Sequence, residues 1–190
     1  SAAGVDLIEL NISCPNVKSG GLAFGISAKT AAEVTLEAKK GAAVPLMVKL
    51  SPNVTDIAEI ARAVEDSGAD ALSLINTLTG MRIDIATRRP VLRNNIGGLS
   101  GPAVFPVAVR MVWQVASAVK LPILGMGGVS SASDAAELML AGADAVAVGS
   151  AIFSDPLAPI KIRDGLRDYL TANGIPRAAD LTGAVLPYQP

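Results

Sequence analysis

The sequence contains no histidine and a single cysteine, Cys14, among its 190 residues. The absence of histidine excludes a Ser–His–Asp triad and a histidine-based metal site, so a general base must be another type of residue. We expect no metal site. One cysteine cannot form an internal disulfide, which is typical of a reducing compartment, and we therefore expect a cytoplasmic protein.

Aromatic residues make up 3% of the chain and charged residues 17%, whereas 51% is hydrophobic. The core must therefore consist mainly of Ala, Val, Ile and Leu, as in buried parallel strands packed against helices. The formal net charge is −1 and neither sign forms a run, so nothing indicates a nucleic-acid or membrane surface. Apolar runs such as residues 145–148 are too short to cross a bilayer, and the first residues show no signal-peptide pattern.

Short apolar runs alternate with longer amphipathic segments along the whole chain. This pattern predicts strands over residues 5–11, 45–50, 71–76, 122–126 and 145–149. Helices are predicted over residues 28–41, 55–68, 101–119, 132–142 and 157–173, with a short one within 177–185. Residues 77–100 lack helical periodicity and are predicted to form a long loop or a small hairpin.

The motif Gly-Ala-Asp-Ala occurs twice, at residues 68–71 and 142–145. Each copy ends a predicted helix and enters a predicted strand, as in a fold made of repeated β/α units. The glycine can end the helix in a left-handed conformation, and the small residues allow a tight turn. Strands that alternate with helices indicate a parallel sheet covered by helices.

Two folds fit this pattern, a doubly wound sheet and a (β/α)8 TIM barrel. We favour the barrel because a polar or glycine motif follows every predicted strand, and in a barrel all these carboxyl ends converge on one site. A doubly wound sheet concentrates its site at one crevice. Since a barrel needs eight units and about 250 residues, we expect residues 1–190 to be the last five units of one barrel domain, with 77–100 as an insertion.

The first chemical motif is Asn11-Ile-Ser-Cys-Pro-Asn16, directly after a predicted strand. The Cys14 thiolate could act as a base or nucleophile if nearby positive charge lowers its pKa. The amides of Asn11 and Asn16 could hold a planar polar ligand. From the spacing alone, a buried structural cysteine is equally plausible, because free cysteine is commonly buried.

Polar residues also end the next two predicted strands. Lys49 closes an apolar strand, so its side chain must point into the barrel or reach its mouth, where it could stabilise negative charge on a cofactor ring. A lysine that merely extends to the barrel end is the alternative. Asn76 and Thr77 stand at the end of the third strand, where a simple turn is nearly as plausible as a ligand contact.

Small residues follow the last two strands, as Gly127–Gly128 and Gly149–Ser150. Phosphate sites in barrels are commonly built by these last two loops from backbone N–H groups and helix N-termini. Gly101 could add a third contact, although Gly-Pro is also an ordinary helix start. Plain tight turns are the alternative for all of these loops.

Together these stretches resemble dihydroorotate dehydrogenase of class 1. The resemblance rests on ELNISCPNVKSGG (9–21), VKLSPNVTDI (48–57), INT (75–77), GGLSGPA (97–103), GMGG (125–128) and AVGSA (147–151). These motifs follow family order over almost the whole chain. The cysteine distinguishes the chain from class 2, which carries serine as the base, and KSGG and SPNVTDI are most similar to subgroup 1B.

The resemblance implies oxidation of (S)-dihydroorotate to orotate by FMN, in the de novo biosynthesis of pyrimidines (UMP). Cys14 would be the general base that takes the proton from C5 while hydride leaves C6, and Lys49 would stabilise the reduced flavin.

Subgroup 1B implies transfer of electrons to NAD through a partner subunit with FAD and a 2Fe-2S cluster. A homodimer, or a heterotetramer with that subunit, is expected. The front third of the family has no counterpart here, so the chain is expected to be a C-terminal portion.

The other contacts implied by the resemblance fall on matching residues of this chain. Flavin would contact Asn11, Lys49, Ile75, Gly101, Gly127, Gly128, Gly149 and Ser150. The pyrimidine would contact Asn11, Asn16, Asn76 and Thr77.

Three alternatives remain open at this point. A barrel like that of dihydropyrimidine dehydrogenase also has a cysteine in this loop, but acts on uracil and thymine. A phosphate-binding lyase or isomerase barrel could use Lys49 to form a Schiff base. A folded scaffold without catalysis is the third.

Overall fold

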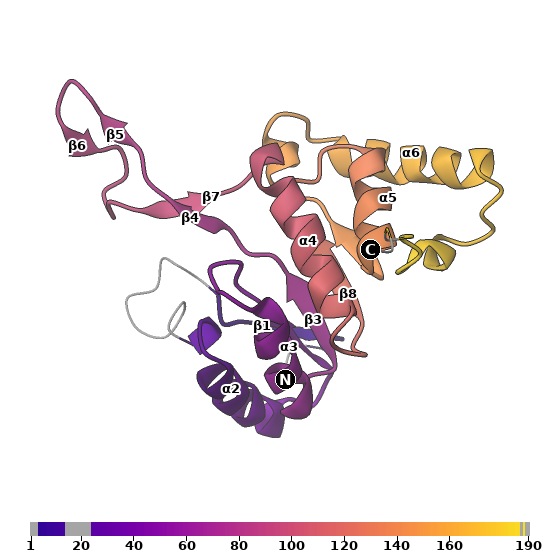
Figure 1. Cartoon of the computed structure of the whole chain (residues 1–190), viewed down its shortest axis with the longest axis horizontal. Coiled ribbons are helices and arrows are strands. Elements are labelled where there is room, and N and C mark those ends of the chain that lie inside the picture. The colour runs from indigo at the N-terminus through magenta and orange to yellow at the C-terminus, as the bar shows by residue number, and fades with distance from the viewer. Residues whose placement is uncertain (1–3, 14–23, 187, 189–190) are drawn as a thin grey trace.

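The computed structural model describes residues 4–13, 24–186 and 188. Its centre is a five-stranded sheet (Figure 1) made of β1 (Ile8–Asn11), β2 (Leu46–Lys49), β3 (Ala71–Leu74), β8 (Ile123–Met126) and β9 (Ala145–Ala147). All neighbouring strands are parallel, and they lie side by side in chain order. A doubly wound sheet would reverse this order at a switch point. The order without reversal confirms the predicted fold class, a partial β/α barrel.

Helices connect the strands and pack against one another in sequence. They are α2 (Ala28–Gly41), α3 (Ile57–Asp66), α4 (Phe105–Ala116), α5 (Ala132–Ala141) and α6 (Ala158–Ala172). The predicted helix over residues 28–41 is found with the same bounds. The helix predicted from residue 101 begins instead with a single 3-10 turn, η1 (Pro102–Val104), in which the Val104 N–H donates to Gly101 O at 3.1 Å. Pro106 has no N–H to offer the carbonyl four residues earlier, so the α-helical ladder cannot begin there.

The main core lies between the sheet and the helices. Side chains alternate along a strand, so one set from each strand points toward the helices. The set on β2, β3 and β8 is buried, and it comprises Leu46, Val48, Leu72, Leu74 and Ile123. The alternate set faces the other side of the sheet, which is the interior of a barrel. Polar side chains of β1, β2 and β3 therefore share this inner face.

Residues 78–99 form an arm that projects from the body of the molecule (Figure 1). Within it, β4 (Leu78–Gly80) pairs antiparallel with β7 (Gly97–Leu99), and β5 (Ile83–Asp84) with β6 (Arg89–Pro90). The arm leaves the body just after β3 and returns just before η1. Its base is therefore held at the carboxyl end of the sheet.

Short helical turns complete the fold. The turn η2 (Ser150–Phe153) follows β9, and η3 (Ala178–Leu181) falls within the region predicted to hold a terminal helix. Leu181 packs against Ala136 and Met139 of α5 in a small second core. In the described part of the chain, no helix combines the length and the apolar character needed to cross a membrane.

The two copies of Gly-Ala-Asp-Ala adopt the same arrangement. The glycines have φ values of +89° and +122°, the left-handed conformation predicted for a helix end. In the first copy, Asp70 Oδ2 accepts from Leu46 N at 2.6 Å, and Asp70 N donates to Leu46 O at 2.8 Å. In the second, Asp144 Oδ2 accepts from Ile123 N at 2.8 Å, and Asp144 N donates to Ile123 O at 2.8 Å. Each aspartate thus fastens the start of its own strand to the start of the previous strand.

Replacing Asp144 by alanine should destabilise the protein by about 1–3 kcal/mol, because the N–H of Ile123 loses its acceptor. Ile123 is 3% exposed, so water cannot easily replace the lost oxygen. The measurement is the urea midpoint of unfolding of the full-length protein. Asp144→Asn keeps a side-chain oxygen and should lose less. Equal losses in the two variants would contradict the role of this hydrogen bond.

Candidate functional site

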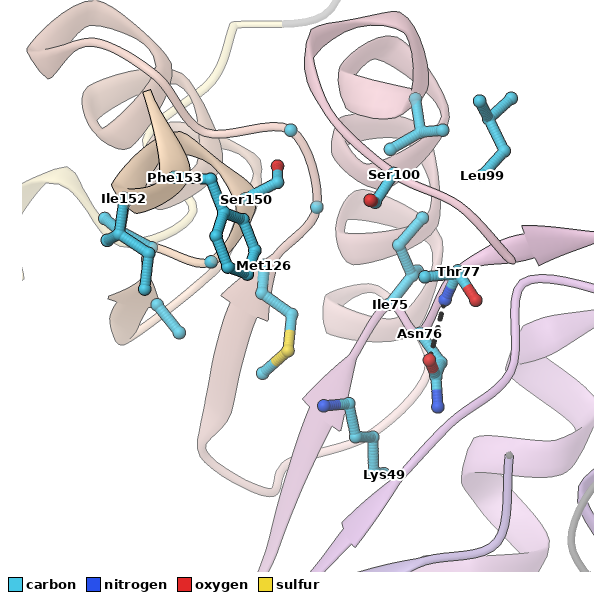
Figure 2. A pocket seen from close by; sticks show the side chains of 16 residues that line it. Lys49, Ile75, Asn76, Thr77, Leu99, Ser100, Met126, Ser150, Ile152 and Phe153 are labelled. Carbon is cyan, nitrogen blue, oxygen red and sulfur yellow. Dashed lines mark hydrogen bonds between the residues drawn. The ribbon is translucent and has the colours of Figure 1, made fainter. Parts of the chain in front are cut away.

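A cavity of about 380 Å³ opens at the carboxyl ends of β2, β3, β8 and β9 (Figure 2). This volume lies within the range of about 300–1,000 Å³ that is usual for small-molecule sites. The cavity brings together most of the predicted site residues, namely Lys49, Ile75, Asn76, Thr77, Gly127, Gly128, Gly149 and Ser150. They come from four different β/α units, as a barrel site requires.

Figure 2 shows two walls facing each other across this cavity. Ser150, Ile152 and Phe153 of η2 form one wall, and the Ile75–Thr77 segment with Ser100 forms the other. Lys49 and Met126 lie between the walls, at the ends of their strands. The cavity therefore combines a cation at its base with apolar side chains on both sides.

Lys49 occupies the inner face of the sheet, in register with Asn11 on one side and Ser73 on the other. Its ammonium lies 3.7 Å from Glu9 Oε1. The other carboxylate oxygen of Glu9 accepts a hydrogen bond from Ser73 Oγ at 2.8 Å. A partly buried lysine needs such a partner to offset the cost of leaving water. Glu9 was not predicted, although its position two residues before Asn11 places it on the same face of β1.

Asn76 is held by a network at the ends of β1 and β3. Its Nδ2 donates to Ser13 Oγ at 2.8 Å and to Asn11 Oδ1 at 3.3 Å, while its Oδ1 accepts from Thr77 N at 2.8 Å. Ser13 Oγ in turn donates to Asn11 Oδ1 at 2.8 Å. Asn11 is thus linked to the site by its hydrogen bond with Asn76, and it does not itself line the cavity. Ser13, which is fully buried, is a site residue that the sequence did not single out.

Asn53 joins the loop after β2 to the base of the arm. Its Nδ2 donates to Thr77 O at 2.9 Å, and its Oδ1 accepts from Thr79 N at 2.8 Å. These two bonds satisfy a donor and an acceptor of the neighbouring backbone, much as a strand partner would. They fix the direction in which the chain leaves β3, and so the placement of Asn76 and Thr77.

The glycine loops differ in how much room surrounds them. Gly128 has a φ of +80°, and a Cβ there would lie 2.6 Å from Gly101 O. Gly127 has a φ of +126°, and a Cβ would lie 2.9 Å from Ile75 Cγ1. Both therefore serve a tight turn as well as lining the cavity. A Cβ on Gly149 would have nothing within 4 Å, so this glycine opens onto free space. Gly101 does not line the cavity itself, but a Cβ there would lie 4.0 Å from Ser150 Oγ, and its carbonyl oxygen packs against Gly128.

The N-terminus of α5 is closed by its own side chains. Ser131 Oγ accepts from Asp134 N at 3.2 Å, and Asp134 Oδ2 accepts from the N–H groups of Ser130 and Ser131 at 2.8 and 2.9 Å. Burial by itself raises the pKa of Asp134, but these hydrogen bonds outweigh it and hold the pKa below its usual range. The helix end is thus already capped. Among the described residues, by contrast, none accepts a hydrogen bond from the N–H of Gly127 or Gly128.

Two predicted site residues, Cys14 and Asn16, lie outside the described residues. Cys14 directly follows Ser13 in the sequence and Asn16 comes two residues later, and Ser13 is part of the Asn76 network. No group of three or more metal-ligating side chains occurs among the residues that the structure describes.

The fold and the cavity define a partial β/α barrel with a cavity of small-molecule size at the carboxyl ends of its strands. The family model of dihydroorotate dehydrogenase matches residues 2–170. The chain belongs to this family.

Several relatives match almost the entire chain. It is 61% identical over 183 residues to the catalytic subunit of dihydroorotate dehydrogenase B (NAD(+)) of Desulforamulus reducens, covering 96% of this chain and 60% of the relative. The corresponding subunit of Bacteroides thetaiotaomicron is 55% identical over 181 residues, which is 95% of this chain and 60% of the relative. The chain thus spans about three fifths of the length of the curated relatives it matches.

A solved structure supports the fold independently of close sequence similarity. The crystal structure of DHODH in complex with ferulenol from Eimeria tenella superimposes with a TM-score of 0.79 at 23% identity. The match covers 94% of this chain and 54% of the other. The described units therefore share their fold with about half of that longer chain.

Proposed function

We propose that the protein oxidises (S)-dihydroorotate to orotate with FMN in pyrimidine biosynthesis. The observation that carries the proposal is the single cavity onto which Lys49, Asn76, Thr77 and the two glycine loops converge. Membership of the dihydroorotate dehydrogenase family supports the substrate. Similarity to the NAD(+)-linked catalytic subunits supports a B-type enzyme.

The described residues fit an FMN molecule in three respects. Ile75 and Met126 offer apolar surface to a flat ring, and Lys49 offers a cation at the base of the cavity. The N–H groups of Gly127 and Gly128, which have no acceptor among the described residues, suit a phosphate, because backbone donors of this kind commonly bind anions. When bound, the flavin supplies the acceptor for the hydride that leaves the substrate.

The protein's own residues would hold the substrate and move its proton. Asn11, Asn16, Asn76 and Thr77 would bind the pyrimidine, and Cys14 would take the proton from C5. The Asn11–Ser13–Asn76 network supports this assignment, since it holds the Asn76 amide in one orientation before any ligand binds. Such preorganisation reduces the entropy lost on binding.

The path of the electrons beyond the flavin would involve a partner. We propose transfer to NAD through a subunit that carries FAD and a 2Fe-2S cluster, in a heterotetramer built on a homodimer. The support is the name of the relatives, which describes them as catalytic subunits of an NAD(+)-linked enzyme. A cytoplasmic location would suit this assembly.

The absorption spectrum of the full-length protein tests the proposal. We expect a flavin spectrum that bleaches anaerobically when dihydroorotate is added and does not bleach with dihydrouracil. Bleaching by dihydrouracil alone would favour the dihydropyrimidine dehydrogenase alternative. A colourless protein that binds no added FMN would refute the flavin assignment altogether.

The glycine loops allow ligand binding to be separated from folding. Gly149→Ala adds a methyl group on the cavity wall where nothing lies within 4 Å, so we expect an intact fold and FMN binding weakened about tenfold or more. A tenfold loss corresponds to about 1.4 kcal/mol. Gly128→Ala is the comparison, because its methyl would meet Gly101 O at 2.6 Å and should lower thermal stability too. Fluorescence titration with FMN and circular dichroism give the two readouts; unchanged FMN affinity in Gly149→Ala would count against the phosphate site.

Cys14→Ser should slow the reduction of bound flavin by dihydroorotate, because a hydroxyl is a much weaker acid than a thiol and forms the basic anion less readily. General acid–base catalysis contributes about 10²–10⁴-fold, so we expect a loss of at least the lower value. Stopped-flow absorbance measures the rate, and the flavin content of the variant serves as the control. A near-normal rate at full flavin content would rule out the base role.

A further inference from the structure

Glu9 is an acidic residue of the inner sheet face to which the proposed reaction assigns no role. Its Oε1 lies 3.7 Å from Lys49 Nζ, and its Oε2 accepts the Ser73 hydroxyl at 2.8 Å. The Glu9 side chain is 33% exposed and that of Lys49 is 20% exposed. The pair is therefore partly withdrawn from water, which strengthens the interaction relative to a surface ion pair.

The sheet register sets the direction of this contact. Glu9 pairs with Met47, two residues nearer the amino ends of the strands than the Asn11–Lys49–Ser73 row. Lys49 lines the cavity, whereas Glu9 does not. The carboxylate thus lies on the amino-terminal side of Lys49 and outside the lining of the cavity.

Lys49 meets no second acidic partner in the part of the chain that the structure describes. Ser73, which is fully buried, holds the other oxygen of Glu9 and so restricts how the carboxylate can turn. Among the described residues, Glu9 is therefore the carboxylate that constrains the ammonium at the cavity.

We propose that Glu9 is a positioning residue that acts through Lys49 and lowers the reduction potential of the bound flavin. This inference rests on the proposed function. A cation beside the ring favours the extra negative charge of the reduced state, and a fixed carboxylate behind that cation offsets part of the effect. A lower potential makes the reduced flavin a stronger donor to the next electron acceptor.

The test is the midpoint potential of the flavin in the full-length protein, measured by dye-coupled spectroscopic titration. Glu9→Gln keeps the size of the side chain and removes its charge, so we expect the potential to rise. Glu9→Asp withdraws the carboxylate and should give a smaller rise, which keeps the test open if the first variant fails to fold. An unchanged or lowered potential in these variants would overturn the proposal.

A double-mutant cycle shows whether the effect passes through Lys49. In a Lys49→Met background, Glu9→Gln should shift the potential much less than it does in the wild type. An equal shift in both backgrounds would mean that Glu9 acts on the flavin directly, which contradicts a positioning role.

Glu37→Gln is the matched control. Glu37 pairs with Lys40 at 2.6 Å on the exposed surface of α2, so the same substitution there should leave the potential unchanged. A wild-type protein that binds no flavin would refute the proposed function, and this inference with it. Flavin-loaded Glu9→Gln with the wild-type potential would refute only the role of Glu9.

Discussion

The parallel pairing of the strands in chain order is the constraint on which the rest of the structure depends. Because every strand runs in the same direction, residues far apart in the sequence end at one edge of the sheet. Lys49, Asn76 and Gly127 become neighbours of one cavity for this reason. The paired aspartates of the two Gly-Ala-Asp-Ala copies support this order by fastening β3 to β2 and β9 to β8 at the opposite edge.

The same sheet separates two environments. Its outer face is apolar and packs under the helices, while its inner face carries Glu9, Asn11, Lys49 and Ser73. In this setting polar groups must satisfy one another, because leaving one unpaired away from water is costly. The result is a set of fixed side chains that converge on the cavity: an ion pair behind Lys49 and an amide network around Asn76. Such fixed groups are what a site needs to bind a polar, planar ligand with little rearrangement.

Much of this arrangement could be predicted from local patterns. The helix over residues 28–41 shows clear amphipathic periodicity, and the two Gly-Ala-Asp-Ala copies mark helix ends. Other features could not be predicted, because they depend on contacts between distant residues. Asn53 lies between a predicted strand and a predicted helix, and it bonds the backbone on both sides of Leu78. Ser13 and Ser73 are common residue types that gain importance only from the buried partners they meet.

The sequence by itself determined the alternation of β and α, the resemblance to class 1 dihydroorotate dehydrogenases and the identity of the residues at the strand ends. These depend on periodicity and on short motifs, which are local properties. Only the tertiary structure decided which side chains meet. Strand register brought Glu9 to Lys49. The packing of the two glycine loops left no room for a Cβ on Gly128 but left free space beside Gly149. Register and turn packing are set by the whole sheet and its helices, so no single segment of the sequence contains them.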